Sequence, residues 1–190
     1  MSRQLARGLA ACALAAAATA PAFAGDLTGK FVDVQLIFPT ADDVRGDRAV
    51  TVHSGAEIAC DGNGAGTDVC TGFIVASSFD IGADSITLDI TGGHSSWNVY
   101  DFNGYAFTGL AAGGTWTGYT LSTNFAGLDD SRVTFTPDSL AINMQGIQAD
   151  AGDFFTLTLN STPAVPEPAN VAMLLAGAAA LAGIARRKRA

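Results

Sequence analysis

The segment 60–70 carries the residue types and spacing that most readily suggest chemistry. It reads CDGNGAGTDVC, and its glycines allow the tight turns that Ca²⁺ coordination needs around the oxygen ligands Asp61, Asn63 and Asp68. The match to an EF-hand loop fails, because its fifth position would be Ala65 and its twelfth would be Gly72 instead of glutamate. A hairpin tip in which Asp, Asn and Gly only form turns explains the same residues. We expect such a turn, no cofactor, and Ca²⁺ only as a weaker alternative.

The ends of this segment, Cys60 and Cys70, are expected to form a disulfide. They remain as an even pair once Cys12 leaves with the signal peptide described below, and exported proteins fold where thiols are oxidised. The bond would close a short loop and stabilise the fold by about 2–3 kcal/mol. The C-x9-C spacing is too wide for the common zinc motifs, which separate paired cysteines by fewer residues.

No pattern of catalytic residues stands out in the sequence. The histidines, His53 and His94, lie in no recognisable metal-ligand spacing, and no Gly-x-Ser-x-Gly nucleophile elbow occurs. The acid pairs Asp42-Asp43 and Asp129-Asp130 fall in predicted turns, where solvated carboxylates are ordinary. A glycosidase would need one carboxylate in a shielded pocket. We therefore expect a protein that is not an enzyme.

Aromatic residues gather in one stretch of the chain, and they comprise Trp97, Tyr100, Phe102, Tyr105, Phe107, Trp116 and Tyr119. On neighbouring strands such rings could stack against sugars, and the candidate glycan contacts are Trp97, Tyr100 and Trp116. Their hydrogen-bond partners would be Asn98, Asp101 and Asn103. The alternative, which alternation along strands favours, is that the rings fill the core of the domain.

Hydrophobic alternation with a period of two predicts strands through most of the middle of the chain. The clearest examples are Ile86, Leu88 and Ile90 in one strand and Phe155, Leu157 and Leu159 in the last. No window shows a convincing helical period. The predicted strands are 32–38, 49–59, 72–79, 85–91, 97–102, 104–110, 115–123, 131–136, 139–144 and 153–160.

The connections between these strands follow from turn residues. Asn103-Gly104 is a strong two-residue hairpin signal and predicts that 104–110 returns antiparallel to 97–102. The Pro137-Asp138 turn is expected to join the two strands on either side of it. The polar segment 40–48 is predicted to be a loop.

Short strands at this spacing indicate an all-β fold, an antiparallel β-sandwich of jelly-roll or immunoglobulin-like order. An immunoglobulin domain proper is not indicated, because Cys60 and Cys70 lie in one loop and cannot bridge two sheets around a tryptophan. The predicted domain spans 25–162, which suits one hydrophobic core.

The middle of the chain is strongly acidic. Of the 18 acidic residues, all but Glu167 lie in 25–164, where the only basic residues are Lys30, Arg45, Arg48 and Arg132, for a net charge of about −13. A nucleic-acid partner is therefore excluded, because no basic patch is present to meet the phosphates. Binding to an anionic membrane surface is disfavoured for the same reason.

The first 24 residues read as a secretory signal peptide. Arg3 and Arg7 precede an apolar run, and Ala22-Phe23-Ala24 is a small-x-small cleavage site. Cleavage is expected between Ala24 and Gly25.

Three blocks follow one another at the C-terminus. The first is a stiff, proline-containing motif, Val165-Pro166-Glu167-Pro168. The second, 171–185, is uncharged and alanine-rich, and as a helix it would be about 22 Å long, short of a hydrocarbon core of about 30 Å. The third is the basic tail, Arg186, Arg187, Lys188 and Arg189.

This arrangement over 163–190 resembles the PEP-CTERM sorting signal of Gram-negative bacteria. The resemblance implies that an exosortase recognises the Pro-Glu-Pro motif while the short helix spans the inner membrane. The basic tail would lie in the cytoplasm by the positive-inside rule and the domain in the periplasm. The protein would then be cut near the motif and passed to the cell surface or extracellular matrix.

The sequence therefore predicts an exported, non-enzymatic β-sandwich protein that an exosortase sorts to the cell surface or exopolysaccharide matrix. A carbohydrate-binding module that acts on matrix polysaccharide is the alternative function. A plain C-terminal anchor with a proline-rich stalk is the alternative explanation of the tail.

Overall fold

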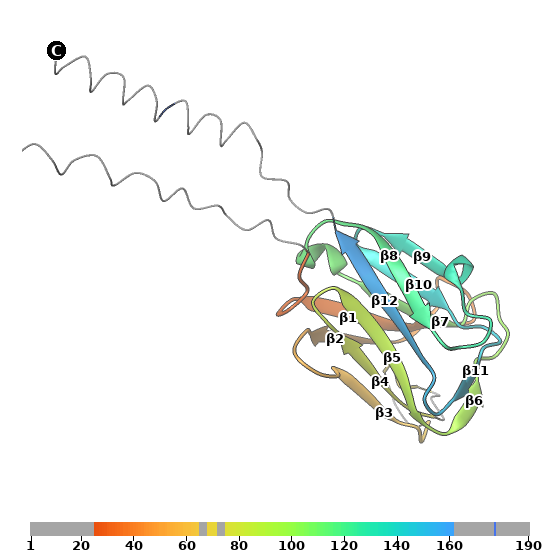
Figure 1. Cartoon of the computed structure of the whole chain (residues 1–190). Helices are drawn as coiled ribbons and strands as arrows, with labels where there is room; N and C mark the ends of the chain where they lie inside the picture. The colour runs from red at the N-terminus through yellow and green to blue at the C-terminus, as the bar shows by residue number, and fades with distance from the viewer. Residues whose placement is uncertain (1–24, 65–67, 72–74, 162–176, 178–190) are drawn as a thin grey trace, which may run out of the picture. The chain divides into compact units, whose positions relative to one another are not determined.

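The computed structural model describes residues 25–64, 68–71, 75–161 and 177, and residues 25–161 belong to one compact unit (Figure 1). The predicted signal peptide and sorting signal lie outside the described residues, except for Gly177, which is in a helix. Within the described part of the chain, no helix is both long and apolar enough to cross a membrane.

The domain is all-β, and every strand pairing is antiparallel. One five-stranded sheet has the order β2-β1-β7-β10-β9, and a second has the order β3-β4-β5-β12-β8. The first sheet consists of β1 (Phe31–Ile37), β2 (Val44–Thr51), β7 (Gly104–Thr108), β9 (Val133–Thr136) and β10 (Ser139–Asn143). The second consists of β3 (Ile58–Asp61), β4 (Ala76–Ile81), β5 (Ser85–Gly92), β8 (Trp116–Thr123) and β12 (Phe154–Ser161).

Smaller elements complete the domain. A two-stranded ribbon pairs β6 (His94–Ser96) with β11 (Gln148–Asp150). Two short 3-10 helices, η1 (Leu110–Gly113) and η2 (Asp130–Arg132), lie in the connections before β8 and β9.

The two sheets share one hydrophobic core, which makes the domain a β-sandwich. The predicted inward residues of β5 and β12 are buried, with exposed fractions of 0–3%. Phe79 of β4 contacts the aromatic rings of Tyr105 and Phe107 in β7, with ring centroids 5.0 and 6.1 Å apart. Because β4 and β7 belong to different sheets, these contacts join the two layers.

The predicted alternation is confirmed for β1, β5 and β12. The strands predicted at 115–123 and 139–144 are present as β8 and β10, and the Pro137-Asp138 turn joins β9 to β10 as expected. The strand order includes a three-strand meander, β3-β4-β5.

One predicted hairpin is wrong. Residues 97–103 form a loop, and β7 pairs with β1 and β10 in the middle of its sheet. Gly104 serves a different purpose from a turn residue, because a Cβ there would collide with the carbonyl oxygen of Ile142 on the neighbouring strand. The glycine allows the two strands to approach each other closely. In the sequence, a glycine needed for this reason looks the same as a glycine needed in a turn.

The polar segment 40–48 is also not wholly a loop, because β2 begins at Val44. β2 is an edge strand that buries only Gly46 and Val50, so it shows no regular alternation. The short ribbon strands β6 and β11 were not predicted for a similar reason, since strands of three residues are too short for a period to show.

The two ends of the described domain meet. The backbone N–H of Gly25 donates to Oγ of Ser161 at 3.2 Å, although the two residues are 136 positions apart. Gly25 also packs so closely on Trp116 that a Cβ at position 25 would meet the indole ring. We call this region, formed by Gly25, Leu110, Trp116 and Ser161, the terminal end of the sandwich.

Candidate functional site

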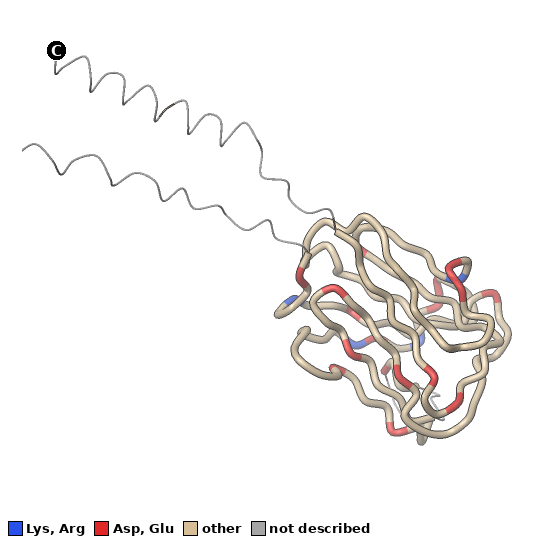
Figure 2. Tube along the Cα trace, in the orientation of Figure 1, with Lys and Arg blue, Asp and Glu red and all other residues tan. Residues whose placement is uncertain are grey.

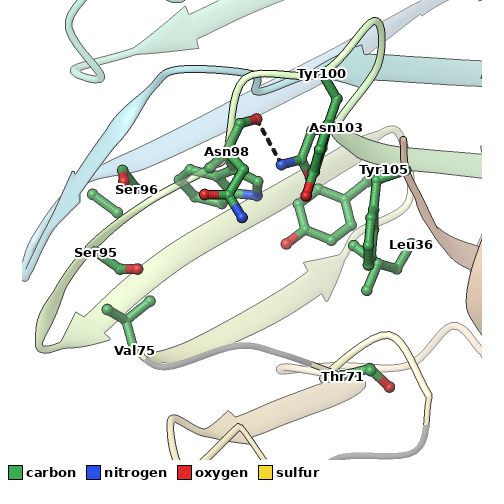
Figure 3. A pocket seen from close by; sticks show the side chains of 12 residues that line it. Leu36, Thr71, Val75, Ser95, Ser96, Asn98, Tyr100, Asn103 and Tyr105 are labelled. Atoms are coloured by element: carbon green, nitrogen blue, oxygen red, sulfur yellow. Dashed lines mark hydrogen bonds between the residues drawn. The ribbon is translucent and has the colours of Figure 1, made fainter. Parts of the chain in front are cut away.

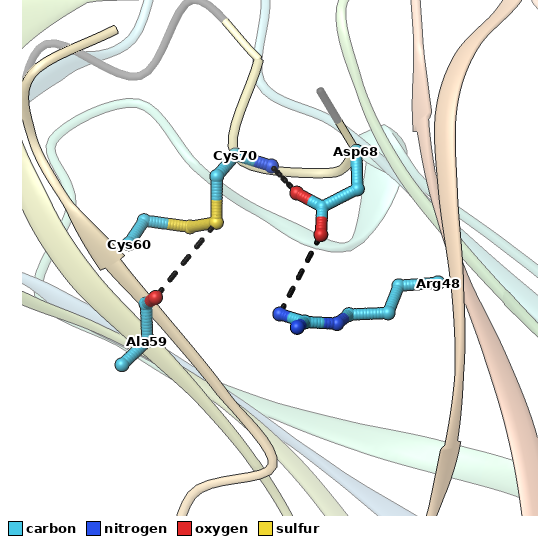
Figure 4. A network of polar contacts seen from close by, with 5 residues as sticks. All are labelled: Arg48, Ala59, Cys60, Asp68 and Cys70. Atoms are coloured by element: carbon cyan, nitrogen blue, oxygen red, sulfur yellow. Dashed lines mark hydrogen bonds and ion pairs between the residues drawn. A yellow bond between two sulfur atoms is a disulfide. The ribbon is translucent and has the colours of Figure 1, made fainter. Parts of the chain in front are cut away.

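The predicted disulfide between Cys60 and Cys70 is present, with the two Cα atoms 5.4 Å apart. The loop that it closes is held by other contacts as well. Asp68 pairs with Arg48 of β2 at 3.5 Å, and its other carboxylate oxygen accepts the backbone N–H of Cys70 at 3.0 Å (Figure 4). Val69 is completely buried. The segment 68–71 is thus held by the disulfide, by the ion pair of Asp68 with Arg48 and by the burial of Val69.

The candidate Ca²⁺ ligands are Asp61, Asn63 and Asp68, and they do not share one network of contacts. Asp61 accepts the backbone and side-chain N–H groups of Asn63 at 3.1 and 2.6 Å, which is the pattern of an Asx turn. Asp68 instead faces the positive charge of Arg48. No group of three His, Cys, Asp or Glu side chains gathers as a metal site among the described residues. This geometry favours the turn interpretation.

The two histidines are exposed and lie apart from each other in the fold. His94 contacts the carboxylate of Asp150 at 2.6 Å across the β6–β11 ribbon, and both side chains are about two-thirds exposed. His53 lies 3.8 Å from Glu57, whose side chain is buried. Glu57 accepts the backbone N–H groups of His53 and Ile81 at 2.9 and 2.7 Å, which gives this carboxylate a structural role.

A pocket with a cavity volume of about 170 Å³ lies at the end of β1 (Figure 3). Its walls come from the β1 end, the disulfide loop, the β6–β11 ribbon, the 97–103 loop and β7. The lining residues are Leu36, Phe38, Thr71, Val75, Ser95, Ser96, Trp97, Asn98, Tyr100, Asn103, Tyr105 and Ala149. The pocket therefore combines aromatic rings with amide and hydroxyl groups, and we call it the aromatic pocket.

Trp97 is held firmly at this pocket although it lies in a loop. Its backbone N–H donates to Ile147 at 3.0 Å, and its carbonyl oxygen accepts from Gly146 at 2.9 Å. The indole meets the rings of Tyr105 and Phe125 edge to face, with centroids 6.5 and 5.9 Å apart. The side chain is partly buried and packs against the core, which leaves part of it to line the pocket.

Tyr100 forms an exposed part of the pocket wall. Its ring is stacked on that of Phe38, with centroids 6.1 Å apart and an interplanar angle of 13°. Arg45 holds Phe38 in turn, because its guanidinium lies 5.4 Å above the ring and its Nε donates to the Phe38 carbonyl oxygen at 2.7 Å. Tyr100 remains 40% exposed, so one part of this stacked pair faces solvent.

Asn103 closes the loop that carries these residues. Its side-chain Nδ2 donates to the carbonyl oxygen of Asn98 at 2.9 Å, a bond drawn in Figure 3, and its backbone N–H donates to Oδ1 of Asn143 at 3.1 Å. Asn103 is 7% exposed. It acts as a positioning residue, because it ties both Asn98 and the loop end to the sheet.

Tyr105 forms part of the pocket lining from β7. Its side chain is completely buried, and burial raises the pKa of its hydroxyl well above the ordinary value for tyrosine. The group is therefore neutral at physiological pH, and its buried hydroxyl adds no charge to the pocket.

The structure separates the three candidate glycan contacts. Trp97 and Tyr100 line the same pocket, together with two of the proposed hydrogen-bond partners, Asn98 and Asn103. Trp116 is 1% exposed at the terminal end, and its Nε1–H donates to the carbonyl oxygen of Leu110 at 2.8 Å. Trp116 thus belongs to the core, and its proposed contact with a glycan is wrong.

Several lining residues were not predicted from the sequence. Phe38, Thr71 and Ser95 come from three segments that are distant in the chain, and only the folded arrangement brings them together. Phe38 is the last residue of the predicted strand 32–38, and Pro39 after it signals the end of that strand.

Acidic residues are spread along the chain of the domain, and basic residues are few (Figure 2). The residues described as lining the aromatic pocket include no lysine, arginine, histidine, aspartate or glutamate. The pocket is thus a neutral site on an acidic protein. No family model, no curated protein and no solved structure matches this chain.

Proposed function

We propose that this is an exported, non-enzymatic β-sandwich protein that an exosortase sorts to the cell surface or the exopolysaccharide matrix. Before processing, the short C-terminal helix would hold it in the inner membrane with the domain in the periplasm. The resemblance of 163–190 to a PEP-CTERM signal motivates this proposal. The disulfide adds support, because such bonds persist in oxidising compartments.

The observation that carries the proposal is the match between the folded domain and the predicted processing sites. The first strand begins at Phe31, six residues after the expected signal-peptide cleavage, and the last strand ends at Ser161, four residues before Val165. Gly25, the residue after the expected cleavage, is packed on Trp116. Cleavage at both sites would therefore leave every described strand intact.

The sorting proposal is tested by changing Pro166, Glu167 and Pro168 to alanine in cells that produce the protein. We expect the variant to keep its C-terminal segment and to stay in the membrane fraction. Pro163→Ala is the matched control, because it removes a nearby proline outside the motif and should leave processing intact. An unchanged mature mass and location in the triple variant would contradict the proposal.

A carbohydrate-binding module that acts on matrix polysaccharide is the second candidate, and the aromatic pocket favours it. Sugar rings present flat C–H faces that stack on aromatic side chains, while their hydroxyls need amide and hydroxyl partners. In the pocket, Trp97 and Tyr100 supply the aromatic faces. Asn98 and Ser96 supply the amide and hydroxyl groups.

This second candidate is tested by affinity gel electrophoresis in the exopolysaccharide of the producing bacterium. The polysaccharide should retard the parent protein, and Trp97→Ala should migrate without retardation. Phe31→Ala is the matched control, because Phe31 is 72% exposed at the other end of β1. Equal migration of parent and Trp97→Ala would count against the module, whereas the sorting proposal would be unaffected.

A further inference from the structure

The aromatic pocket has room for little more than one sugar ring. Its volume of about 170 Å³ lies below the roughly 300–1,000 Å³ typical of sites for drug-sized ligands. The remaining units of a polysaccharide bound there must therefore lie outside the pocket. The surface next to Tyr100 is the place where they could bind.

A second, more open hollow of about 670 Å³ lies next to the first. It is lined by Pro39, Thr40, Val99, Tyr100, Asp101 and Gln145. The two hollows share Tyr100, and Phe38 of the first is followed in the chain by Pro39 and Thr40 of the second. The stacked pair of Phe38 and Tyr100 thus stands between two adjoining sites.

Both walls of the second hollow are braced. The backbone N–H of Phe102 donates to the carbonyl oxygen of Pro39 at 3.0 Å, which ties the 97–103 loop to the end of β1. On the other side, Nη1 of Arg132 donates to the carbonyl oxygens of Asn143 and Gln145 at 3.2 and 2.8 Å. A site that is ordered before binding loses less conformational entropy when a ligand arrives.

The chemistry of the second hollow continues that of the first. Val99 is 77% exposed and gives an apolar contact, while Thr40, Asp101 and Gln145 offer hydrogen-bonding groups around it. Asp101 and the net charge of about −13 over 25–164 repel anionic chains such as polyuronates. A neutral chain meets no such repulsion.

We propose that the two hollows are consecutive subsites for adjacent units of one neutral polysaccharide chain, with Tyr100 as their common wall. One ring enters the aromatic pocket, and the next lies over Val99 and Gln145. This proposal rests on the carbohydrate-binding candidate above. It extends that candidate, because it requires a ligand of at least two sugar units that carries no charge.

The test uses a glycan array that carries neutral hexose oligomers of one to four units, with acidic oligomers of the same lengths. We expect binding of neutral oligomers only, with an affinity that rises roughly tenfold or more from one unit to two, the gain of a few added hydrogen bonds. Val99→Asp should abolish this rise and leave monosaccharide binding unchanged. Ala112→Asp adds the same charge to an exposed residue of η1 and serves as the matched control.

The outcomes separate the two proposals. Equal affinity for one unit and two, equal binding of acidic chains, or an unchanged length dependence in Val99→Asp would overturn the subsite proposal and leave a sugar-binding pocket in place. Binding to no oligomer of the array would overturn the carbohydrate-binding candidate as well. Neither result bears on sorting, which the cellular experiment reads separately.

Discussion

The two tryptophans of the domain, Trp97 and Trp116, look equivalent in the sequence and occupy opposite kinds of environment. Trp116 is 1% exposed and hydrogen-bonded inside the core, whereas Trp97 is partly buried and lines the aromatic pocket. The first serves the terminal end of the sandwich, where the chain enters and leaves the domain. The second serves the end of the fold where the pocket lies.

A β-bulge explains why Trp116 is buried. Tyr119 and Leu121 of β8 pack against the core, so strict alternation would turn Trp116 toward solvent. In the pairing with β12, however, Asn160 lies opposite Gly118 and Ser161 lies opposite Trp116, so β8 contains one extra residue. The extra residue reverses the direction of the indole. A local irregularity thus converts a candidate binding residue into a core residue.

The largest expected effect is that of Trp116→Ala. It removes a fully buried indole and leaves the carbonyl oxygen of Leu110 without its donor, so the free energy of unfolding should fall by about 3–5 kcal/mol. Denaturant unfolding measures the change. Trp116→Phe keeps most of the buried ring and should lose clearly less. A loss below about 1 kcal/mol for Trp116→Ala would contradict the core assignment.

The disulfide should give the next largest effect. Replacing Cys60 and Cys70 together by serine should lower the free energy of unfolding by about 2–3 kcal/mol, because it frees a loop whose ends are 10 residues apart. The buried Val69 and the ion pair of Arg48 with Asp68 should still hold the loop near its place.

Reduction of the disulfide in the parent protein is the control for this prediction. The parent protein should lose a similar amount of stability when its disulfide is reduced, and the serine variant should not respond. Because Thr71 lies directly after Cys70 and lines the aromatic pocket, the variant also tests whether the pocket end depends on this bond. A serine variant as stable as the oxidised parent would show that the bond adds nothing to the fold.

Trp97→Ala should affect binding more than stability. Its indole is only partly buried, and its edge-to-face contacts with Tyr105 and Phe125 make the loss of unfolding free energy about 1–2 kcal/mol. The variant should stay folded by circular dichroism and fail to bind the polysaccharide. A loss of stability equal to that of Trp116→Ala would remove the contrast between the two residues.

The sequence was most informative where burial follows a regular period. β5 and β12 alternate without interruption, so their inward residues could be predicted one by one, and the close pair of cysteines predicted its own disulfide. The edge strand β2 and the three-residue ribbon strands bury too few side chains for a period to appear.

The aromatic pocket could be predicted only in part. Trp97, Tyr100 and Asn98 are close in sequence and were identified together, but Phe38 and Thr71 reach the pocket through strand pairings that no local pattern specifies. Gly104 was misleading because a glycine needed for close strand packing and a glycine needed in a turn look the same in a sequence.

The smallest expected effect is a change in how the stability of the fold depends on acidic pH, and it comes from Asp26 at the terminal end. The hydroxyl and the backbone N–H of Thr28 hydrogen-bond to Asp26, with the backbone bond at 2.8 Å, and hold the pKa of this carboxyl below its ordinary value of about 3.8. Because the folded pKa is lower than the unfolded one, the ionised carboxylate stabilises the fold above about pH 4. This contribution is lost as the pH falls through the folded pKa.

Asp26→Asn tests this effect with little change in shape, because asparagine keeps an oxygen that can accept the Thr28 N–H. We expect a small loss of stability at pH 7 and a flatter decline of stability below pH 4, measured by denaturant unfolding across the acid range. Asp129, whose pKa is lowered by hydrogen bonds from Ser131, should behave in the same direction in a separate variant. An unchanged acid profile in Asp26→Asn would show that the residues next to Gly25 contribute packing alone, and the terminal end would then owe its stability to Trp116 and its neighbours.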